Sequence, residues 1–271
     1  MAKKRRRKKR QNTSLLSVAI AAAAIIWGVY TKGGQENLTS TSSNTSTSSS
    51  TVSSAQTAKT VYGGLAKSDY QKLAQETFKS GGKGWRYVNN NHSTLVKSAW
   101  KVNRVIYSNL DSQNRTSSSN TAFLEKRNVA NDSLRVRQYV QPTGWHSNRQ
   151  NGTQIYNRGH LIAYSVSAGI DQDGNYNPKN LFTQSAFSNQ KIQTIFESKV
   201  RSALRSGKKV IYQATPIFRG RELMARGINL QAVSTDGSLD FNVYIYNVQP
   251  GYQFDYETGR AKIDRSMQVS E

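Results

Sequence analysis

Apolar residues recur at helical spacing in two segments of the chain. In residues 68–78 they fall on one side of a helix that would end at Gly81 and Gly82, since glycine commonly terminates helices. Residues 184–205 are the strongest helical segment, and Gly207 follows them closely. The pattern therefore predicts a short helix early in the folded part of the chain and a longer one near its centre.

Other segments are rich in alternating, β-branched and aromatic residues, which favours strands. These segments are residues 103–107, 135–140, 209–215 and 239–248. Residues 142–145 and the pair Asp236-Gly237 predict turns, and the polar stretch 110–120 predicts a loop. No internal repeat is visible, so the predicted class is α+β, with strands flanking the central helix.

The N-terminal segment differs from the rest of the chain. Residues 3–10 are all Lys or Arg, and an apolar run follows from Leu15 to Tyr30. Alone, the basic segment also fits a nuclear-localisation or nucleic-acid-binding arm. Directly before an apolar run it indicates the positive-inside flank of an export signal. We predict a basic cytoplasmic tail (1–12) and a retained membrane anchor (13–32). Cleavage as a signal peptide, with secretion, is the alternative, because spanning helices need roughly 17 to 25 residues.

Residues 33–60 are predicted to be a disordered linker. Of residues 39–60, 16 of 22 are Ser or Thr and none is aromatic. Such a composition buries too little apolar surface to fold. The folded domain is therefore expected at residues 61–271, which are enough for one core. This organisation describes an extracellular C-terminal domain on a stalk, attached to the cell membrane by a single span.

Charge and residue usage restrict the chemistry further. The formal net charge is +22, and residues 60–271 hold 28 Lys and Arg against 15 Asp and Glu. This excess favours a polyanionic partner such as nucleic acid, anionic lipid or teichoic acid. Cysteine is absent, and His92, His146 and His160 are the three histidines. Thiolate and multi-histidine zinc sites are thus disfavoured, and a metal should be an oxygen-liganded one such as Mg²⁺.

One ordered set of residues contains candidate catalytic groups. The run Asn157-Arg158-Gly159-His160 is followed by Asn180, Gln184, Asn189 and Glu197. A histidine, a lone amide and a carboxylate are the groups needed to hydrolyse a phosphodiester with one hard metal ion. Taken singly, His160 also fits a structural histidine, Asn189 a surface amide, and Glu197 an i+4 partner of Arg201.

As a set, these residues resemble the DNA/RNA non-specific endonuclease family, and within it the membrane-anchored DNA-entry nucleases and streptodornases of Gram-positive bacteria. The family pattern is Asp-Arg-Gly-His, then Asn-x-x-x-Gln-x-x-x-x-Asn, then Glu eight residues on. Only the first Asp is replaced here, by Asn157. Flanking similarity extends over about residues 142–256. The resemblance implies a ββα-metal (His-Me finger) core with flanking antiparallel strands and helices, with His160 near a strand end and Asn189 on the next helix.

The resemblance also implies a role for each residue. Neutral His160 would take the proton of the attacking water. Asn189 would be the direct ligand of Mg²⁺, with Mn²⁺ as a substitute, and Glu197 would reach a water on that ion. On an ideal helix these two residues lie ~12 Å apart along the axis, too far to bind one ion directly together. Arg158 would be a phosphate or structural partner, and Asn180 and Gln184 would orient the metal loop.

Three assignments are less constrained. If the family's Asp tunes the imidazole through its charge, Asn157 would lower activity or shift its pH optimum. If that Asp only bonds the loop, Asn157 can replace it, which we favour because the other positions match. Arg127 is our candidate for the family's transition-state arginine. A further basic group forms either a phosphate-binding patch or a solvated face: Lys208, Lys209, Arg219, Arg221 and Arg226.

The expected function is metal-dependent cleavage of extracellular DNA and RNA to 5′-phosphate ends, for DNA uptake or for nutrition and defence. Two binding functions are the alternatives: a catalytically weakened DNA receptor, supported by Asn157, and a wall protein that holds teichoic acid by charge. DNA-uptake machinery and an inhibitor protein are partners that the resemblance implies. No residue identifies them or the oligomeric state.

Overall fold

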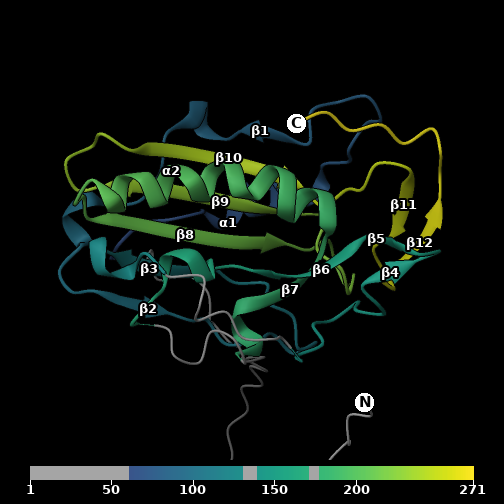
Figure 1. Ribbon diagram of the computed structural model, residues 1–271, viewed down its shortest axis with the longest axis horizontal. Coiled ribbons are helices and arrows are strands. Elements are labelled where there is room, and N and C mark those ends of the chain that lie inside the picture. Colours follow the sequence, from purple (N-terminus) through teal and green to yellow (C-terminus); the bar gives the residue numbers. More distant parts are fainter. Residues whose placement is uncertain (1–60, 131–138, 171–176) are drawn as a thin grey trace, which may run out of the picture. The chain divides into compact units, whose positions relative to one another are not determined.

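The computed structural model of the protein describes residues 61–130, 139–170 and 177–271. A six-stranded antiparallel sheet forms its centre (Figure 1). The strand order is β1 (Trp85–Tyr87), β10 (Asp240–Tyr246), β9 (Gly227–Ser234), β8 (Val210–Ile217), β3 (Asn120–Leu124) and β2 (Arg104–Ile106). Strands β8 and β9 pair along their whole length and are buried throughout. They are the rigid centre against which the other elements pack.

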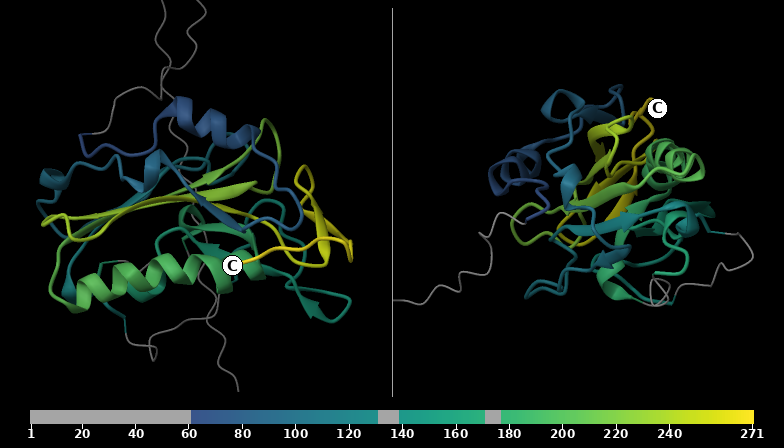
Figure 2. Two further views of the ribbon diagram at one scale, coloured as in Figure 1. Left: turned by 90° about the horizontal axis from the view of Figure 1, so that it is seen from above. Right: turned by 90° about the vertical axis from the view of Figure 1, so that its left-hand side faces the viewer.

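A helix covers each face of this sheet (Figure 2). Helix α1 (Lys67–Gln75) packs Leu73 against Ile217 and Tyr244. On the other face, helix α2 (Thr194–Arg205) buries one apolar stripe, whose residues Phe196, Val200 and Leu204 join the main core. Because both faces are covered, the central strands have no solvent-facing side. Some of their inward positions hold polar residues that bond to each other or to nearby backbone, including Gln213, Asn229 and Gln231.

Shorter elements surround the sheet. Three two-stranded pairs are β4 (Arg149–Gln150) with β5 (Thr153–Gln154), β6 (Tyr156–His160) with β7 (Leu181–Ser185), and β11 (Tyr252–Asp255) with β12 (Arg260–Ile263). A π-helical segment, η7 (Ser188–Gln193), leads into α2. The short 3-10 helices are η1 (Asn89–Asn91), η2 (Lys97–Ala99), η3 (Lys126–Asn128), η5 (Tyr164–Val166) and η6 (Pro178–Asn180).

Asn247, directly after β10, fastens the β6–β7 pair to the central sheet. Its side-chain oxygen accepts from the Ser185 backbone N–H at 2.7 Å, and its Nδ2 donates to the carbonyls of Thr183 and Ala225. The residue is 1% exposed. A buried amide with all these partners is a costly group to displace. The pair that contains His160 is therefore held on a rigid support.

The predicted α+β class is confirmed, and so are several elements. The candidate strands at 103–107, 209–215 and 239–248 correspond to β2, β8 and β10. The turn at Pro142–Trp145 closes with a 3.1 Å bond from the Trp145 N–H to the Pro142 carbonyl. At the second turn, Gly237 has φ +77° and its N–H donates to the Ser234 carbonyl. The two longer strands were found from their β-branched and aromatic residues, and the turns from their Pro and Gly residues.

Other boundaries were wrong. The first helix ends at Gln75 rather than at Gly81, because the next residue, Glu76, is extended and its carboxylate bonds Arg86 and Tyr246 on the sheet. The second helical run begins after Ser185, since Gln184 and Ser185 belong to β7. The stretch 110–120 is a loop except for its last residue, which starts β3. In the central sheet, strands β1, β3 and β9 were not predicted, and among the shorter pairs β4, β5, β7, β11 and β12 were not predicted either.

Two groups of predictions fall outside the described residues. The candidate strand at 135–140 lies there except for its last two residues, which are not in a strand. The basic tail, the anchor at 13–32 and the linker at 33–60 also lie outside. Among the residues that the structure describes, no helix combines the length and apolar character needed to cross a membrane.

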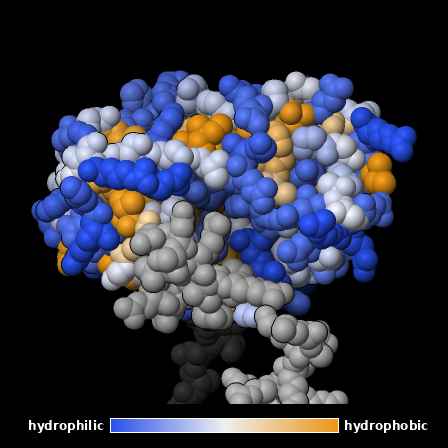
Figure 3. All heavy atoms as spheres, viewed as in Figure 1, coloured by the Kyte–Doolittle hydropathy of each residue, from blue (hydrophilic) through white to orange (hydrophobic). Residues whose placement is uncertain are grey.

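The face of the molecule on which α2 lies is largely hydrophilic (Figure 3). Its apolar residues form small separate groups. The exposed large hydrophobic residues of the described chain come from separate elements and loops, namely Val61, Tyr87, Val96, Val102, Tyr139, Ile195 and Ile263. Scattered exposed apolar side chains are normal for a protein surface. This face suits a polar partner better than an apolar one.

Candidate active site

Strands β6 and β7 and the helical run after them form a ββα unit. The two strands are antiparallel, with Asn157 opposite Gln184 and His160 opposite Leu181. His160 is the last residue of β6 and is half-buried, and Asn189 lies in η7, just beyond β7. The strand pair and the helix therefore bring the candidate residues into one unit, in the arrangement that the resemblance implies.

Four neutral amides form a continuous hydrogen-bonded group in this unit, here called the amide cluster: Asn157, Asn189, Gln184 and Gln193. Asn157 Nδ2 donates to Asn189 Oδ1 at 2.9 Å, and Asn189 Nδ2 donates to Gln184 Oε1 at 2.9 Å. Gln184 Nε2 donates in turn to Gln193 Oε1 at 2.9 Å. The cluster thus links β6, β7 and η7 through side chains alone.

Two contacts of the main chain hold the end of β6. The His160 carbonyl accepts from Gln193 Nε2 at 2.9 Å, so His160 joins the amide cluster through its backbone. Just beyond it, the buried Asn180 side chain accepts from the Ile162 N–H at 2.8 Å and donates to the Ile162 carbonyl at 3.0 Å. Such paired contacts fix the chain direction after His160. They are compatible with the loop-orienting role expected of Asn180 and Gln184, which stays a prediction.

Gly159 is required by the close approach of Gln184. A Cβ atom at position 159 would lie 2.1 Å from Gln184 Oε1 and 2.8 Å from Gln184 Cβ. Real Cβ contacts are not that short, so no other residue fits without moving Gln184. Packing therefore explains the Gly of the Arg-Gly-His run, because the absence of a side chain at Gly159 leaves room for the Gln184 amide, which bonds Asn189.

Glu197 connects the site to the core of the domain. Its Oε1 accepts from Gln193 Nε2 at 2.8 Å, and its Oε2 lies 3.9 Å from Arg201 Nη1, the i+4 pair that helix spacing predicts. Burial raises the pKa of the Tyr212 hydroxyl well above its ordinary value, and the negative charge of Glu197 raises it further. Glu197 therefore lies between the amide cluster and strand β8.

The ideal-helix estimate of the Asn189–Glu197 separation does not apply. Residues Ser188–Gln193 form a π-helix, whose i→i+5 bonds give wider turns than an α-helix. Asn189 and Glu197 are instead related through the intervening amides of Gln184 and Gln193. Isolated π segments often occur at functional sites.

Two of the predicted arginines make contacts outside the amide cluster. Arg158 Nε donates to the Val140 carbonyl, and its guanidinium lies 4.1 Å from the Trp145 ring centroid. Those contacts are compatible with a structural role for Arg158, and the choice between that role and a phosphate contact stays a prediction. Arg127 is exposed, bonds Asn103 at 3.0 Å and pairs with Glu125 at 2.6 Å. Its described contacts tie it to the β2–β3 edge, and the transition-state role stays a prediction.

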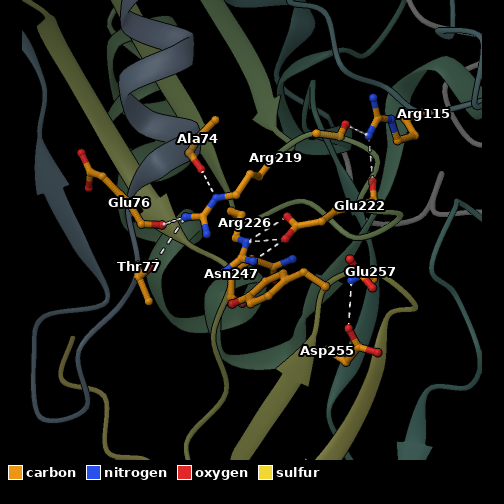
Figure 4. A network of polar contacts seen from close by, with 12 residues as sticks. Ala74, Glu76, Thr77, Arg115, Arg219, Glu222, Arg226, Asn247, Asp255 and Glu257 are labelled. Atoms are coloured by element: carbon orange, nitrogen blue, oxygen red, sulfur yellow. Dashed lines mark hydrogen bonds and ion pairs between the residues drawn. The ribbon is translucent and has the colours of Figure 1, made fainter.

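Two arginines of the predicted basic patch, Arg219 and Arg226, make their contacts inside the fold (Figure 4). Arg226 makes a bidentate pair with Glu222 and lies over Tyr256, and Arg219 donates to the carbonyls of Ala74 and Glu76 at the end of α1. We call Arg219, Glu222 and Arg226 the arginine cluster. Lys208 pairs with Asp236, and Lys209 lies over Trp100. The contacts of Arg219 and Arg226 are internal to the fold, whereas Arg221 is exposed, and whether the exposed members of this group bind phosphate stays a prediction.

Gln193 is a site residue that the sequence pattern does not predict. This residue is 1% exposed, and its amide contacts β6, β7 and Glu197 at once. Its signal is weak, because a glutamine within a helical run is ordinarily a surface residue. Its position four residues after Asn189, on the same helix side, was the available indication.

The donor atoms suit a hard, hydrated cation. Over the described parts of the chain, no group of three or more His, Cys, Asp and Glu side chains could hold a metal ion. The oxygens offered by the site are the amide oxygen of Asn189 and the carboxylate of Glu197. Few oxygen donors from the protein, with water for the rest, are what Mg²⁺ accepts.

Comparison with known proteins gives the same family. A family model described as DNA/RNA non-specific endonuclease matches residues 93–236, more than half of the chain. NucA from Streptococcus agalactiae with magnesium bound is 30% identical, with a TM-score of 0.61 over 73% of this chain and 97% of NucA. Its metal-free structure is 32% identical, with a TM-score of 0.59 over 72% and 96%.

A curated deoxyribonuclease from Streptococcus dysgalactiae subsp. equisimilis is also similar. It is 38% identical over 50 residues, which are 18% of this chain and 15% of that protein. The match therefore spans only a small part of the relative's length. The family model and the NucA structures cover far more, and together they show that the chain belongs to the DNA/RNA non-specific endonuclease family.

Proposed function

We propose that the protein is a Mg²⁺-dependent endonuclease that hydrolyses DNA and RNA to 5′-phosphate ends. One observation carries the proposal: Asn189, on the helical side of the ββα unit, is bonded to both strands of the pair that ends at His160. A lone amide held by neighbours on both strands is a preorganised ligand, and preorganisation is what a catalytic site requires.

In the proposed mechanism His160 is the general base. A neutral imidazole takes the proton of the attacking water, which is the usual task of a catalytic histidine. Asn189 would hold the cation through Oδ1, and Glu197 would bind a water of that ion. When bound, Mg²⁺ stabilises the charge that develops on the phosphate and on the leaving 3′ oxygen. The P–O3′ bond breaks, so the upstream fragment ends in a 3′-hydroxyl and the phosphate stays on the 5′ oxygen of the downstream fragment.

Substrate range follows from what the proposed mechanism does not use. No step needs a 2′-hydroxyl or the edge of a base, so DNA and RNA should both be cut with little sequence preference. Magnesium is supported by the structure of NucA with that ion bound. Mn²⁺ should replace it, because it accepts the same oxygen ligands.

The proposed cellular role rests on the N-terminal sequence. An eight-residue basic segment before an apolar run suits a retained membrane anchor, and the Ser/Thr-rich stretch suits a tether for an extracellular domain. A tethered nuclease is suited to processing DNA for uptake beside a transport machinery. Release into the medium would suit nutrition or defence instead.

Nicking of supercoiled plasmid by the full-length protein tests the enzymatic part. We expect nicking with Mg²⁺ or Mn²⁺, none with EDTA, parallel cleavage of single-stranded RNA, and products that a ligase rejoins without prior kinase treatment. Fractionation of cells, with and without detergent, tests the anchor.

Two outcomes would contradict the proposal. Nicking that persists in EDTA would exclude the metal. Tight DNA binding without any nicking would favour the receptor, and the Asn157→Asp variant would then show whether the amide at this position is responsible.

A further inference from the structure

Gln193 lies at the junction of the amide cluster. Both hydrogens of its Nε2 are used, one on the His160 carbonyl at 2.9 Å and one on Glu197 Oε1 at 2.8 Å. Its Oε1 accepts from Gln184 Nε2 at 2.9 Å. The residue is 1% exposed, so water does not offer alternative partners. Gln193 therefore has one orientation in which all of its polar atoms are satisfied.

The backbone sets that orientation. A main-chain carbonyl can only accept a hydrogen bond, so the group that faces the His160 carbonyl must be the Nε2 of Gln193. The oxygen of Gln193 then faces Gln184 and selects the nitrogen of that residue. Reversal of the Gln193 amide would place its oxygen against the His160 carbonyl and leave buried polar atoms without partners, which is costly.

The same logic passes from Gln184 to Asn189. With its nitrogen on Gln193, Gln184 presents Oε1 to Asn189 and accepts from Asn189 Nδ2. The remaining amide atom of Asn189, Oδ1, is thereby turned away from Gln184 and towards Asn157. Gln184 itself is 1% exposed and lies against Gly159, which leaves it little freedom to rotate. The orientation of the Gln193 amide therefore sets which atom is donor and which is acceptor in Gln184 and then in Asn189.

The helix geometry supports this arrangement. Asn189 and Gln193 are four residues apart in the π segment, so both can reach the one side chain of Gln184 on β7. Gln193 ends that segment, and α2 follows with regular spacing. The irregular turn coincides with the two residues whose amides must meet the strand pair.

We propose that Gln193 is a positioning residue, which orients the Asn189 amide so that its oxygen rather than its nitrogen is offered to the cation. This inference rests on the proposed function, in which Asn189 holds the metal. A group that orients a metal ligand typically changes metal affinity 10–100-fold when it is lost. Loss of Gln193 is therefore expected to weaken metal binding by about that factor.

The test is a titration of the full-length protein with Mn²⁺ in the absence of substrate, in which electron paramagnetic resonance measures the bound ion. Gln193→Met keeps the bulk of the side chain but cannot bond Gln184 or the His160 carbonyl. Gln213→Met is the matched control: Gln213 is 2% exposed and bonds Thr121 and the Leu65 N–H, on the central sheet. We expect Gln193→Met to bind Mn²⁺ about 10–100-fold more weakly and Gln213→Met to bind it like the wild type.

Melting temperatures measured without metal separate orientation from stability. A merely structural role would lower the melting temperature of both variants and leave their Mn²⁺ affinities equal, which would overturn the inference. If Gln193→Met does not fold, Gln184→Met is used instead, because Gln184→Met removes the acceptor of the hydrogen bond from Asn189 Nδ2. Wild-type Mn²⁺ affinity in Gln184→Met would likewise overturn the inference.

Asn189→Ala distinguishes the inference from the proposed function. Wild-type Mn²⁺ binding by Asn189→Ala would show that the metal lies elsewhere, and the proposed function would fail at that point. Lost binding in Asn189→Ala together with unchanged binding in Gln193→Met would leave the metal site standing and reject only the positioning role.

Discussion

The amide cluster and the arginine cluster are both polar networks inside the domain, but they are built from different groups. The amide cluster uses neutral side chains and connects the two strands and the helix of the ββα unit. The arginine cluster uses full charges: Glu222 and Arg226 pair with side chains only 9% and 19% exposed, and Arg219 binds the end of α1. Neutral amides can orient a ligand at little desolvation cost, whereas buried charges are stable only as complete pairs.

This difference shows that charged residues of the arginine cluster bond the protein itself, although the sequence is strongly basic. A strongly basic sequence suggests that clustered arginines face a polyanion, yet Arg219 and Arg226 bond the protein itself (Figure 4). The hydrogen bonds that Arg226 donates to the Glu222 carboxylate raise the pKa of Arg226 above its ordinary value, which keeps that pair charged. The arginine cluster should therefore determine stability, and the amide cluster should determine activity and metal affinity.

The largest effect is expected from His160→Ala. Loss of a general base typically costs 10²–10⁴-fold in rate, so plasmid nicking should fall by about that factor while the melting temperature stays near that of the wild type. His92→Ala is the control, because His92 is exposed and pairs with Asp240 on the central sheet. Equal nicking by the two variants would contradict the assignment of His160.

Glu222→Ala should lower the stability of the fold and leave the nicking activity unchanged, the reverse of His160→Ala. Removing one partner of a buried pair leaves Arg226 charged and unmatched, which costs about 3–5 kcal/mol of unfolding free energy. Urea denaturation measures this loss, and nicking per folded molecule should be unchanged. Glu257→Ala removes the same charge from an exposed site and should change stability little. If Glu222→Ala lowered nicking without lowering stability, the assignment of stability to the arginine cluster and of activity to the amide cluster would be wrong.

The sequence predicted the members of the site better than their connections. His160, Asn189 and Glu197 were selected from an ordered motif, and β8 and β10 from their β-branched and aromatic residues. In β9, Ile228, Leu230 and Ala232 alternate regularly with Asn229 and Gln231. Its burial on both faces was not recognisable from this pattern, because the fold buries the two amides in side-chain hydrogen bonds. Gln193 was missed for the same reason: a buried amide is recognisable only once its partners are known. Partners distant in sequence are set by tertiary packing, which local patterns do not contain.

Gly159→Ala tests the packing inside the amide cluster. The new methyl group would displace Gln184, and overpacking of this kind costs about 1–3 kcal/mol. We expect that loss in urea denaturation, together with weaker nicking because Gln184 no longer orients Asn189. A double-mutant cycle with Gln184→Ala supplies the control, since neighbours in contact are not additive. Fully additive losses would show that Gly159 and Gln184 do not act on each other.

Asn157→Asp is expected to have the smallest effect and the most specific one. The carboxylate would face Asn189 Oδ1, which now accepts from Asn157 Nδ2, so two acceptors would meet at 2.9 Å. Without metal this should cost about 1 kcal/mol. A cation held by Asn189 would offset the repulsion, so added Mg²⁺ should raise the melting temperature more than it does in the wild type. Gln154→Ala removes only the solvent-side contact of Asn157 and should change neither quantity. An unchanged response to Mg²⁺ in Asn157→Asp would mean that residue 157 bonds the loop without sensing the metal, which would leave the amide cluster to act through Gln184 and Gln193 alone.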